Sequence, residues 1–391
     1  MVNFKITKNN AGKRLIFFLL ILFTLMPNIL NFKIGPVVLK PLYLWLLILT
    51  VMLFVKKIVC IPYRAITFFI LYAVVISLFA MPWFGLDRTF FNYIVGLVIL
   101  IIFISLGRNI SYDEWIKILC MVWVSLFIAI IINDLFQKDH FMFYFANLSW
   151  MEHPYHNTVV VGGANLEATW VALLSVAFID NRKKWIVFFL SLALSLCYSS
   201  RAAIVCNFIV LFFFVINNTN KSKKIKQLYI VISTLSMIIA LVVIYKMGYF
   251  DRILFRFFEI GSESGSMGRL KMWVNIPTAI VSYPFGVGLG NALKGIEAVS
   301  GHSFNESNLH FLVAQMFLDT GIIGGIAYLY LWIKFLITEF KYKFNLRISL
   351  LLLIYFILSF IQFSGGETFF FCILGIYLNQ RIYQTRKTVR I

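Results

Sequence analysis

Charged residues are scarce in this chain, and acidic residues are the scarcest of all. Only 13% of the 391 residues are charged, about half the share of roughly 25% that is usual in a globular protein. Lys and Arg number 35, whereas Asp and Glu together number only 16, and there are just five cysteines. The low charge excludes a soluble enzyme and a disordered tail. Because no pair of cysteines falls in a predicted outer loop, a secreted disulfide scaffold is excluded as well.

Apolar residues make up 61% of the sequence and gather in long runs. A membrane span needs about 20 such residues. Each backbone amide in lipid must bond within its own segment, so the spans are expected to be helices. The sequence therefore predicts an all-α polytopic membrane protein in which residues 1–391 form a single integral membrane domain of about 12 transmembrane helices. The predicted spans are 15–31, 42–55, 65–83, 91–107, 116–135, 163–180, 185–199, 202–217, 228–246, 321–338, 348–363 and 369–380.

The distribution of charge predicts the orientation of these spans. With the N-terminus in the cytoplasm, the inner segments hold 24 of the 35 basic residues but only four of the 16 acidic residues. Such an excess of Lys and Arg marks the cytoplasmic side of a bacterial inner membrane protein. Both termini are therefore expected in the cytoplasm. The same asymmetry explains the net charge of +19 without any need for a nucleic-acid partner.

Polar residues collect in two predicted outer loops, 136–162 and 247–320. The second loop is too long to lack structure, so it is expected to fold as short helices against the periplasmic face and to carry much of an active site. All five histidines fall on this outer side: His140, His153, His156, His302 and His310. A transporter would instead place ionisable groups in the middle of its spans.

Several short motifs stand out in and near these loops. Residues 284–291 read PFGVGLGN, in which alternating glycines, Gly288 and Gly290 among them, permit a tight turn or the close approach of a ligand. Arg201 lies at the outer tip of a helical hairpin between two predicted spans. Its guanidinium suits bidentate binding of a specific anion, with snorkelling to a lipid phosphate as the alternative.

Taken together, these motifs resemble the superfamily of O-antigen polymerases (Wzy) and O-antigen ligases. The SRAA segment at Arg201 is similar to a hairpin motif of that family, and Gly268-Arg269 with Trp273 and the glycine loop resembles a second block. Asn165, with the apolar span that follows it, resembles a third. The spacing from His310 to Gly321 and Gly324 fits the ligases. The departure is Phe311, where a ligase is expected to have Asn, Ser or Gln.

The resemblance implies a metal-independent, inverting glycosyltransferase of the GT-C type whose donor glycan is carried on undecaprenyl diphosphate. Such a donor needs a lipid-facing groove, cations for the diphosphate and a base for the attacking hydroxyl. We expect Arg201 and Arg269 to bind the diphosphate and to stabilise its charge as it leaves. Lys271 is a weaker candidate that a solvated helix face also explains. Arg252 and Arg256 suit either phosphate or glycan binding or anchoring at the interface.

The catalytic base is sought among His302, His310 and Glu306. Histidine titrates near neutral pH, and if this stretch is helical, Glu306 shares a face with His310 and orients its ring. Amide side chains suit hydrogen bonds to sugar hydroxyls, and the candidates here are Asn165, Asn305 and Asn308. Asn305 and Asn308 also suit a helix cap.

The sequence thus favours a surface-polysaccharide polymerase that joins undecaprenyl-diphosphate-linked repeat units at the periplasmic face of the inner membrane. No cofactor is expected, and no acidic cluster suits Mg²⁺. A chain-length regulator protein is an expected partner. The first alternative is an O-antigen ligase that transfers polysaccharide to the lipid A core, and the second is a polysaccharide flippase.

Overall fold

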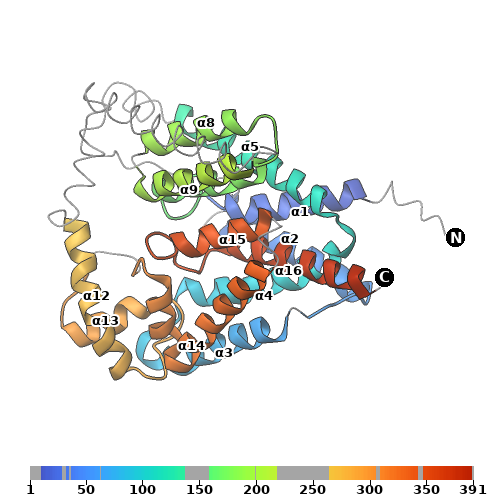
Figure 1. Ribbon diagram of the computed structural model, residues 1–391. Helices are drawn as coiled ribbons and strands as arrows, with labels where there is room; N and C mark the ends of the chain where they lie inside the picture. Colours follow the sequence, from blue (N-terminus) through green and yellow to red (C-terminus); the bar gives the residue numbers. More distant parts are fainter. Residues whose placement is uncertain are drawn as a thin grey trace, which may run out of the picture. The chain divides into compact units, whose positions relative to one another are not determined.

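The structure is a computed structural model (Figure 1) that describes residues 10–28, 32–34, 37–61, 63–136, 158–198, 200–217, 264–304, 309–341 and 347–389. Over these residues the chain forms thirteen α-helices, two short 3₁₀ helices and a hairpin of two three-residue strands. The predicted all-α class is therefore confirmed. Four described helices are long and apolar enough to cross a membrane: α3 (Arg64–Phe84), α4 (Arg88–Leu106), α5 (Tyr112–Phe136) and α14 (Leu312–Lys341). The number of spans stays a prediction.

Other helices coincide with most of the remaining predicted spans. They are α1 (Asn10–Leu25), α2 (Pro41–Val55), α7 (Ala164–Leu174), α8 (Lys184–Cys197), α9 (Arg201–Asn217), α15 (Arg347–Leu358) and α16 (Thr368–Val389). The prediction 15–31 was too long at its end, because α1 stops two residues before Pro27, which has no N–H and disfavours a helical residue before it. The predicted span 228–246 lies outside the described residues.

The chain divides into two compact units. The first contains residues 1–25, 30–118 and 264–391, and the second contains residues 26–29 and 119–263. In the first unit α4 packs along α16, and α14 packs along α3. A Cβ at Gly96 of α4 would lie 2.5 Å from the ring of Phe371 on α16, so the small residue lets this pair of helices approach closely.

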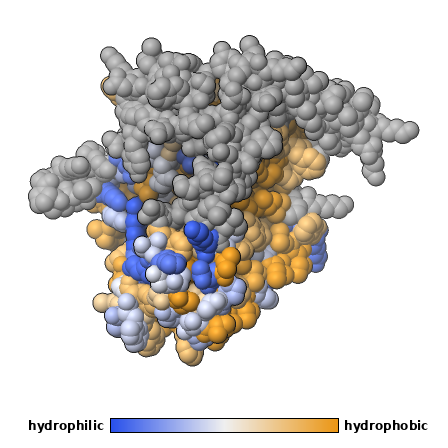
Figure 2. Space-filling model, turned by 90° about the vertical axis from the view of Figure 1, so that its left-hand side faces the viewer, coloured by the Kyte–Doolittle hydropathy of each residue, from blue (hydrophilic) through white to orange (hydrophobic). Residues whose placement is uncertain are grey.

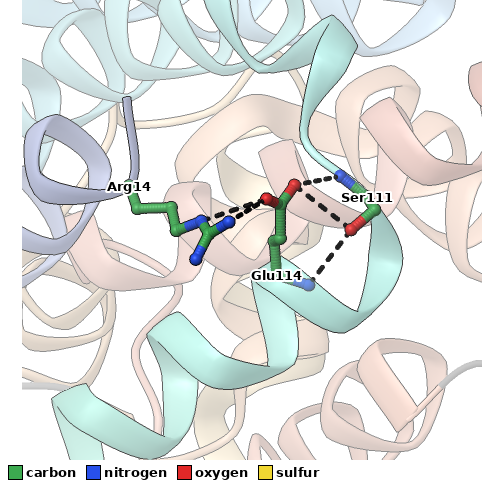
Figure 3. Close-up of polar contacts among 3 residues, drawn as sticks. All are labelled: Arg14, Ser111 and Glu114. Carbon is green, nitrogen blue, oxygen red and sulfur yellow. Dashed lines mark hydrogen bonds and ion pairs between the residues drawn. The ribbon is translucent and has the colours of Figure 1, made fainter. Parts of the chain in front are cut away.

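An ion pair joins α1 to the start of α5 (Figure 3). The Arg14 Nε atom donates a hydrogen bond to Glu114 Oε1 at 3.0 Å. The other oxygen of Glu114 accepts from the Ser111 N–H at 2.9 Å, while Ser111 Oγ accepts from the Glu114 N–H at 3.4 Å. This reciprocal arrangement is a capping box, which begins a helix by satisfying its first N–H groups. Arg14 and Glu114 were predicted on the same side of the membrane, and their pairing places them side by side; which side faces the cytoplasm stays a prediction.

In the second unit α7, α8 and α9 pack against one another. Every residue of α7 from Leu166 to Leu174 is buried, as expected of a helix that is surrounded by protein. Buried polar side chains join α8 to α9, since Asn207 Nδ2 donates to Ser195 Oγ at 2.8 Å and Ser191 Oγ donates to Asn207 Oδ1 at 2.9 Å. Buried hydrogen bonds between α8 and α9 therefore stabilise the predicted hairpin at Arg201.

Segment 264–320 of the first unit, which the sequence predicts outside the membrane, contains α12 (Ser264–Ser282), α13 (Ala292–Ser300) and the beginning of α14. Their apolar side chains form one core cluster that includes Met272, Ile296, Leu309 and Leu318. Figure 2 views the side of the molecule that carries α12 and α13 and shows hydrophilic residues gathered there among apolar ones. This segment therefore has a packed core, and its exposed surface mixes hydrophilic residues with apolar ones such as Val274 and Val281.

Candidate functional site

The glycine loop 284–291 lies against a kink in α14. Gly321, at the kink, has φ 73° and ψ −179°, and a Cβ there would lie 2.5 Å from the carbonyl oxygen of Pro284. The Ile322 N–H donates to that same oxygen at 2.9 Å. Since only glycine accommodates both the positive φ and the contact, the conformation of Gly321 fixes where the loop meets the helix. The predicted span beginning at 321 starts at this kink.

Two backbone hydrogen bonds extend the contact between the loop and α14. The Val287 N–H donates to the Leu318 carbonyl, and the Gly288 N–H donates to the Asp319 carbonyl, both at 2.9 Å. The Leu289 N–H donates to Ser77 Oγ of α3 at 2.9 Å. A Cβ at Gly288 would meet Ser77 and Ala80 of α3, so protein fills the space that we predicted for a ligand at this glycine.

Asp319 is fully buried and lies at the centre of this arrangement. Its Oδ2 atom accepts from the Gly290 N–H at 2.9 Å, and its Oδ1 atom accepts from the Ala292 N–H at 2.8 Å. These N–H groups belong to the end of the loop and to the first residue of α13, where a carboxylate is favoured by unsatisfied backbone donors and by the helix dipole. One side chain of α14 thereby positions both the loop and α13.

A small polar cavity of about 90 Å³ lies beside Gly290. Asp87, Thr89, Gln315 and Ser364 provide its polar lining. The Oε1 atom of Gln315 is buried and accepts no hydrogen bond from the described part of the chain. A buried carbonyl oxygen of this kind needs a donor, such as a water molecule or a sugar hydroxyl. Gly290 therefore borders a space that can take a polar group.

His310 follows a residue that lines the same cavity, Leu309. The carbonyl of Leu309 accepts a hydrogen bond from Trp273 Nε1 of α12 at 3.0 Å. His310 itself has φ 51°, in the left-handed region, and α14 begins two residues later at Leu312. The helical arrangement that we considered for His310 with Glu306 therefore does not extend to His310, because a left-handed residue interrupts a right-handed helix.

Phe311 fills the position at which a ligase was expected to have a polar residue. Its ring lies 5.8 Å from that of Trp273 and 5.5 Å from that of Phe360. Phe311 thus joins α12 to the end of the α15 region through aromatic contacts of a kind that stabilise by about 0.5–1.5 kcal/mol each. Its role in this structure is packing beside His310.

Arg269 lies in α12, one helical turn before Trp273. The contact of Trp273 with Leu309 therefore brings the part of α12 that carries Arg269 close to the His310 segment. His302 lies just beyond the end of α13 and is exposed, as is Lys271 on α12. Several other predicted site residues lie outside the described residues, namely Arg252, Arg256, Asn305, Glu306 and Asn308, together with His153 and His156.

In the second unit the structure brings Arg201 and Asn165 together. Arg201 is the first residue of α9, and the preceding Ser200 donates through Oγ to the Asn165 carbonyl at 3.2 Å. The Asn165 side chain is exposed. The small residues Ala202 and Ala203 are buried, which suits the close packing of α9 against α7. This packing accounts for the small residues in the SRAA segment.

Sequence reasoning missed two buried acids of this unit. Glu167 Oε1 accepts from the Val160 N–H at 3.0 Å and also from the Val159 N–H, and Asp134 Oδ2 accepts from the Tyr198 hydroxyl at 2.7 Å. Asp87 and Gln315 of the first unit were missed as well. The scarcity of acids in the sequence could have pointed to these residues. An acid at the end of an apolar helix needs a hydrogen-bond donor or an opposite charge when it is buried.

The comparisons with known proteins agree with the motifs. Residues 168–329 match the family model described as O-antigen ligase. The predicted resemblance is confirmed over this stretch, which contains Arg201, Arg269, the glycine loop and His310. No curated protein sequence matches the chain.

The match covers less than half of the chain, and over this stretch the protein is similar to the ligase- and polymerase-type membrane enzymes of surface-polysaccharide assembly. Asn165 lies three residues before the matched stretch. Within the described ranges, no group of three or more His, Cys, Asp and Glu side chains is placed to hold a metal ion. That the chemistry needs no metal stays a prediction.

Proposed function

We propose that this protein is a surface-polysaccharide polymerase that joins repeat units carried on undecaprenyl diphosphate at the periplasmic face. A hydroxyl at the non-reducing end of one lipid-linked repeat attacks the anomeric carbon of the donor chain. A new glycosidic C–O bond forms with inversion, and the C–O bond to the diphosphate breaks. The diphosphate leaves with the electron pair, and the hydroxyl proton passes to a base on the enzyme.

One observation carries the proposal. The glycine loop, the buried Asp319, the polar cavity and the His310 segment lie together in the first unit, and the hydrogen bond from Trp273 to Leu309 joins them to α12, the helix that carries Arg269. All of these residues except part of the cavity wall fall inside the family match. The cavity wall includes Leu309, the residue before His310, so a polar cavity that suits a sugar hydroxyl is close along the chain to a candidate base for its proton.

We assign Arg269 and Arg201 to the diphosphate. A guanidinium carries a permanent charge and a planar set of donors that matches phosphate oxygens, so it stabilises negative charge as the leaving group departs. His310 is the proposed base because its spacing to Gly321 matches the family pattern. His302 and Glu306 are retained as the alternatives for the base. Asn165, Asn305, Asn308, Arg256 and the loop at Gly290 are proposed to contact substrate, whereas Gly288 packs against α3 instead.

The ligase is the second candidate, since it would use the same donor. Phe311 argues against it, because an aromatic side chain packed between Trp273 and Phe360 replaces the polar residue expected beside the histidine. A flippase is less well supported, since the glycine loop, Arg269 and His310 belong to one segment, 264–320, that the sequence predicts outside the membrane and not along a central path.

Deletion in the native host separates these functions. Lipopolysaccharide on a silver-stained gel should lose its ladder and keep a core band that carries a single repeat, because repeats can still be transferred to the core but not joined. Bare core with long chains retained on undecaprenyl diphosphate would establish a ligase. Repeats held on the cytoplasmic leaflet would establish a flippase. An unchanged ladder would overturn O-antigen as the product and direct the search to other surface polymers.

A further inference from the structure

A second, much larger cavity lies in the first unit, among α3, α4, α14, α15 and α16. Its volume is about 580 Å³, within the range of roughly 300–1,000 Å³ that is typical of ligand sites. Most of its wall is aromatic or aliphatic, and Tyr93, Tyr328, Trp332 and Phe371 are among the lining residues. None of the motifs assigned to glycosyl transfer contributes to it. We refer to it below as the aromatic cleft.

The aromatic cleft is elongated along the helices that line it. On α14 its wall runs from Tyr328 to Thr338, and on α16 it runs from Phe370 to Arg381. At a rise of 1.5 Å per residue each of these segments is about 15 Å long. Half the hydrocarbon thickness of a bilayer is also about 15 Å, so the cleft matches the reach of one lipid chain in one leaflet.

Cations and hydroxyls gather at one end of the cleft. Lys334 is exposed, its Nζ donates to the Tyr63 hydroxyl, and it lies 4.7 Å from the centre of the Tyr63 ring. Arg381 lines the same end and forms an ion pair with the buried Glu339. In the described part of the chain no carboxylate forms an ion pair with Lys334. Two cations and one acid leave this end with one uncompensated positive charge.

We propose that the aromatic cleft binds an anionic phospholipid, with one acyl chain between α14 and α16 and the phosphate against Lys334. An apolar wall excludes a sugar or a free phosphate from the interior, while the ammonium and the tyrosine hydroxyl at the mouth provide donors that suit a phosphate. Lys334 and Arg381 belong to the side predicted to be cytoplasmic, where anionic lipids and basic residues meet. This inference does not depend on the donor or acceptor of the proposed polymerase.

The test uses the full-length protein, purified in detergent and stripped of lipid. Phosphatidylglycerol, phosphatidylcholine and inorganic phosphate are titrated separately, and thermal unfolding and native mass spectrometry are recorded. Phosphatidylglycerol should raise the unfolding temperature. The lipid concentration that gives half of the maximal effect, the midpoint of the titration, should be at least tenfold lower for phosphatidylglycerol than for phosphatidylcholine. Inorganic phosphate should have no effect. Equal effects of the two lipids, or an equal effect of phosphate, would overturn the proposal.

Two variants locate the site. Lys334→Gln should raise the phosphatidylglycerol midpoint about tenfold, whereas Lys341→Gln should leave it unchanged because Lys341, exposed on the same helix, does not line the cleft. Leu331→Trp narrows the cleft and should remove the bound lipid seen by mass spectrometry. If Leu331→Trp does not fold, Lys334→Gln against Lys341→Gln still decides the question. Equal losses in the two lysine variants would contradict a specific site.

Discussion

The carboxylate of Asp319 holds the backbone of Gly290, since its Oδ2 atom accepts a hydrogen bond from the Gly290 N–H at 2.9 Å. Its other oxygen accepts from Ala292 at the start of α13. A single buried side chain therefore joins the kinked helix α14 to the loop and the helix that border the polar cavity. We expect the geometry of the proposed active site to depend on this carboxylate.

Asp319→Asn tests this dependence. The amide keeps the shape of the side chain, but its NH₂ group would face an N–H donor, which leaves a buried donor unsatisfied at a cost of about 1–3 kcal/mol. We predict a lower unfolding temperature and a shortened or absent polymer ladder. The matched control is Asp113→Asn, at an exposed position in the first turn of α5, which should change neither measurement. A fully stable and active Asp319→Asn protein would contradict the assigned role.

Gly290→Ala tests the close packing of the loop. A Cβ at Gly290 would lie 2.2 Å from Asp87 Oδ1, and the residue has φ 82°. Left-handed strain of about 1–2 kcal/mol and overpacking of about 1–3 kcal/mol should act together. Gly301→Ala is the control, because it also has a positive φ but no atom lies within 4 Å of its Cβ. Thermal unfolding should show a clearly larger loss for Gly290→Ala, and equal losses would rule out the packing argument.

Much of the fold was predictable because lipid imposes simple rules. Apolar runs with few charges became helices at nearly the expected positions, and the kink of α14 coincides with the predicted start of a span at 321. The positions of α12 and α13 were harder to predict, because neither helix contains an apolar run long enough to cross the membrane. Their positions depend on tertiary contacts such as the one between Trp273 and Leu309.

The candidate site was predictable only in part. The resemblance to the family motifs singled out Arg201, Arg269 and His310. It did not reveal that Asp319 would bond to Gly290, nor that Asp87 and Gln315 would line a common cavity. Those relationships join residues more than 25 positions apart, and local sequence patterns contain no information about them.

The capping box at Ser111 predicts an order of stabilities in the first unit. Arg14 is about half exposed, with 44% of its side-chain surface accessible, so its ion pair with Glu114 should contribute roughly 1 kcal/mol or less. Ser111 satisfies a helix N–H and should contribute about 1 kcal/mol or more. Ser111→Ala should therefore lower the unfolding temperature at least as much as Arg14→Gln does. A double-mutant cycle of Arg14→Gln with Glu114→Gln measures the ion pair, and a coupling of several kcal/mol would contradict this reasoning.

Arg201→Lys distinguishes anion recognition from simple charge. Lysine keeps the positive charge but loses the planar pair of donors, so bidentate binding of a diphosphate oxygen pair is lost. We predict that the variant remains in the membrane at normal levels but produces no polymer in a deletion strain. A lysine that restored the full ladder would show that a single point charge at the start of α9 is sufficient.

Arg269→Ala is the most direct test of the proposed chemistry, because α12 offers its own control two residues away. Removal of a cation that stabilises the departing diphosphate should lower the rate by at least about 10²-fold, as the loss of one electrostatic donor commonly does. The ladder should disappear, and single repeats should remain on the core. Lys271→Ala removes an equal charge from an exposed position on the same helix and should leave the ladder intact. If both variants lose the ladder, general attraction by a basic helix replaces specific binding as the explanation. If Arg269→Ala retains it, Arg269 is not part of the diphosphate site.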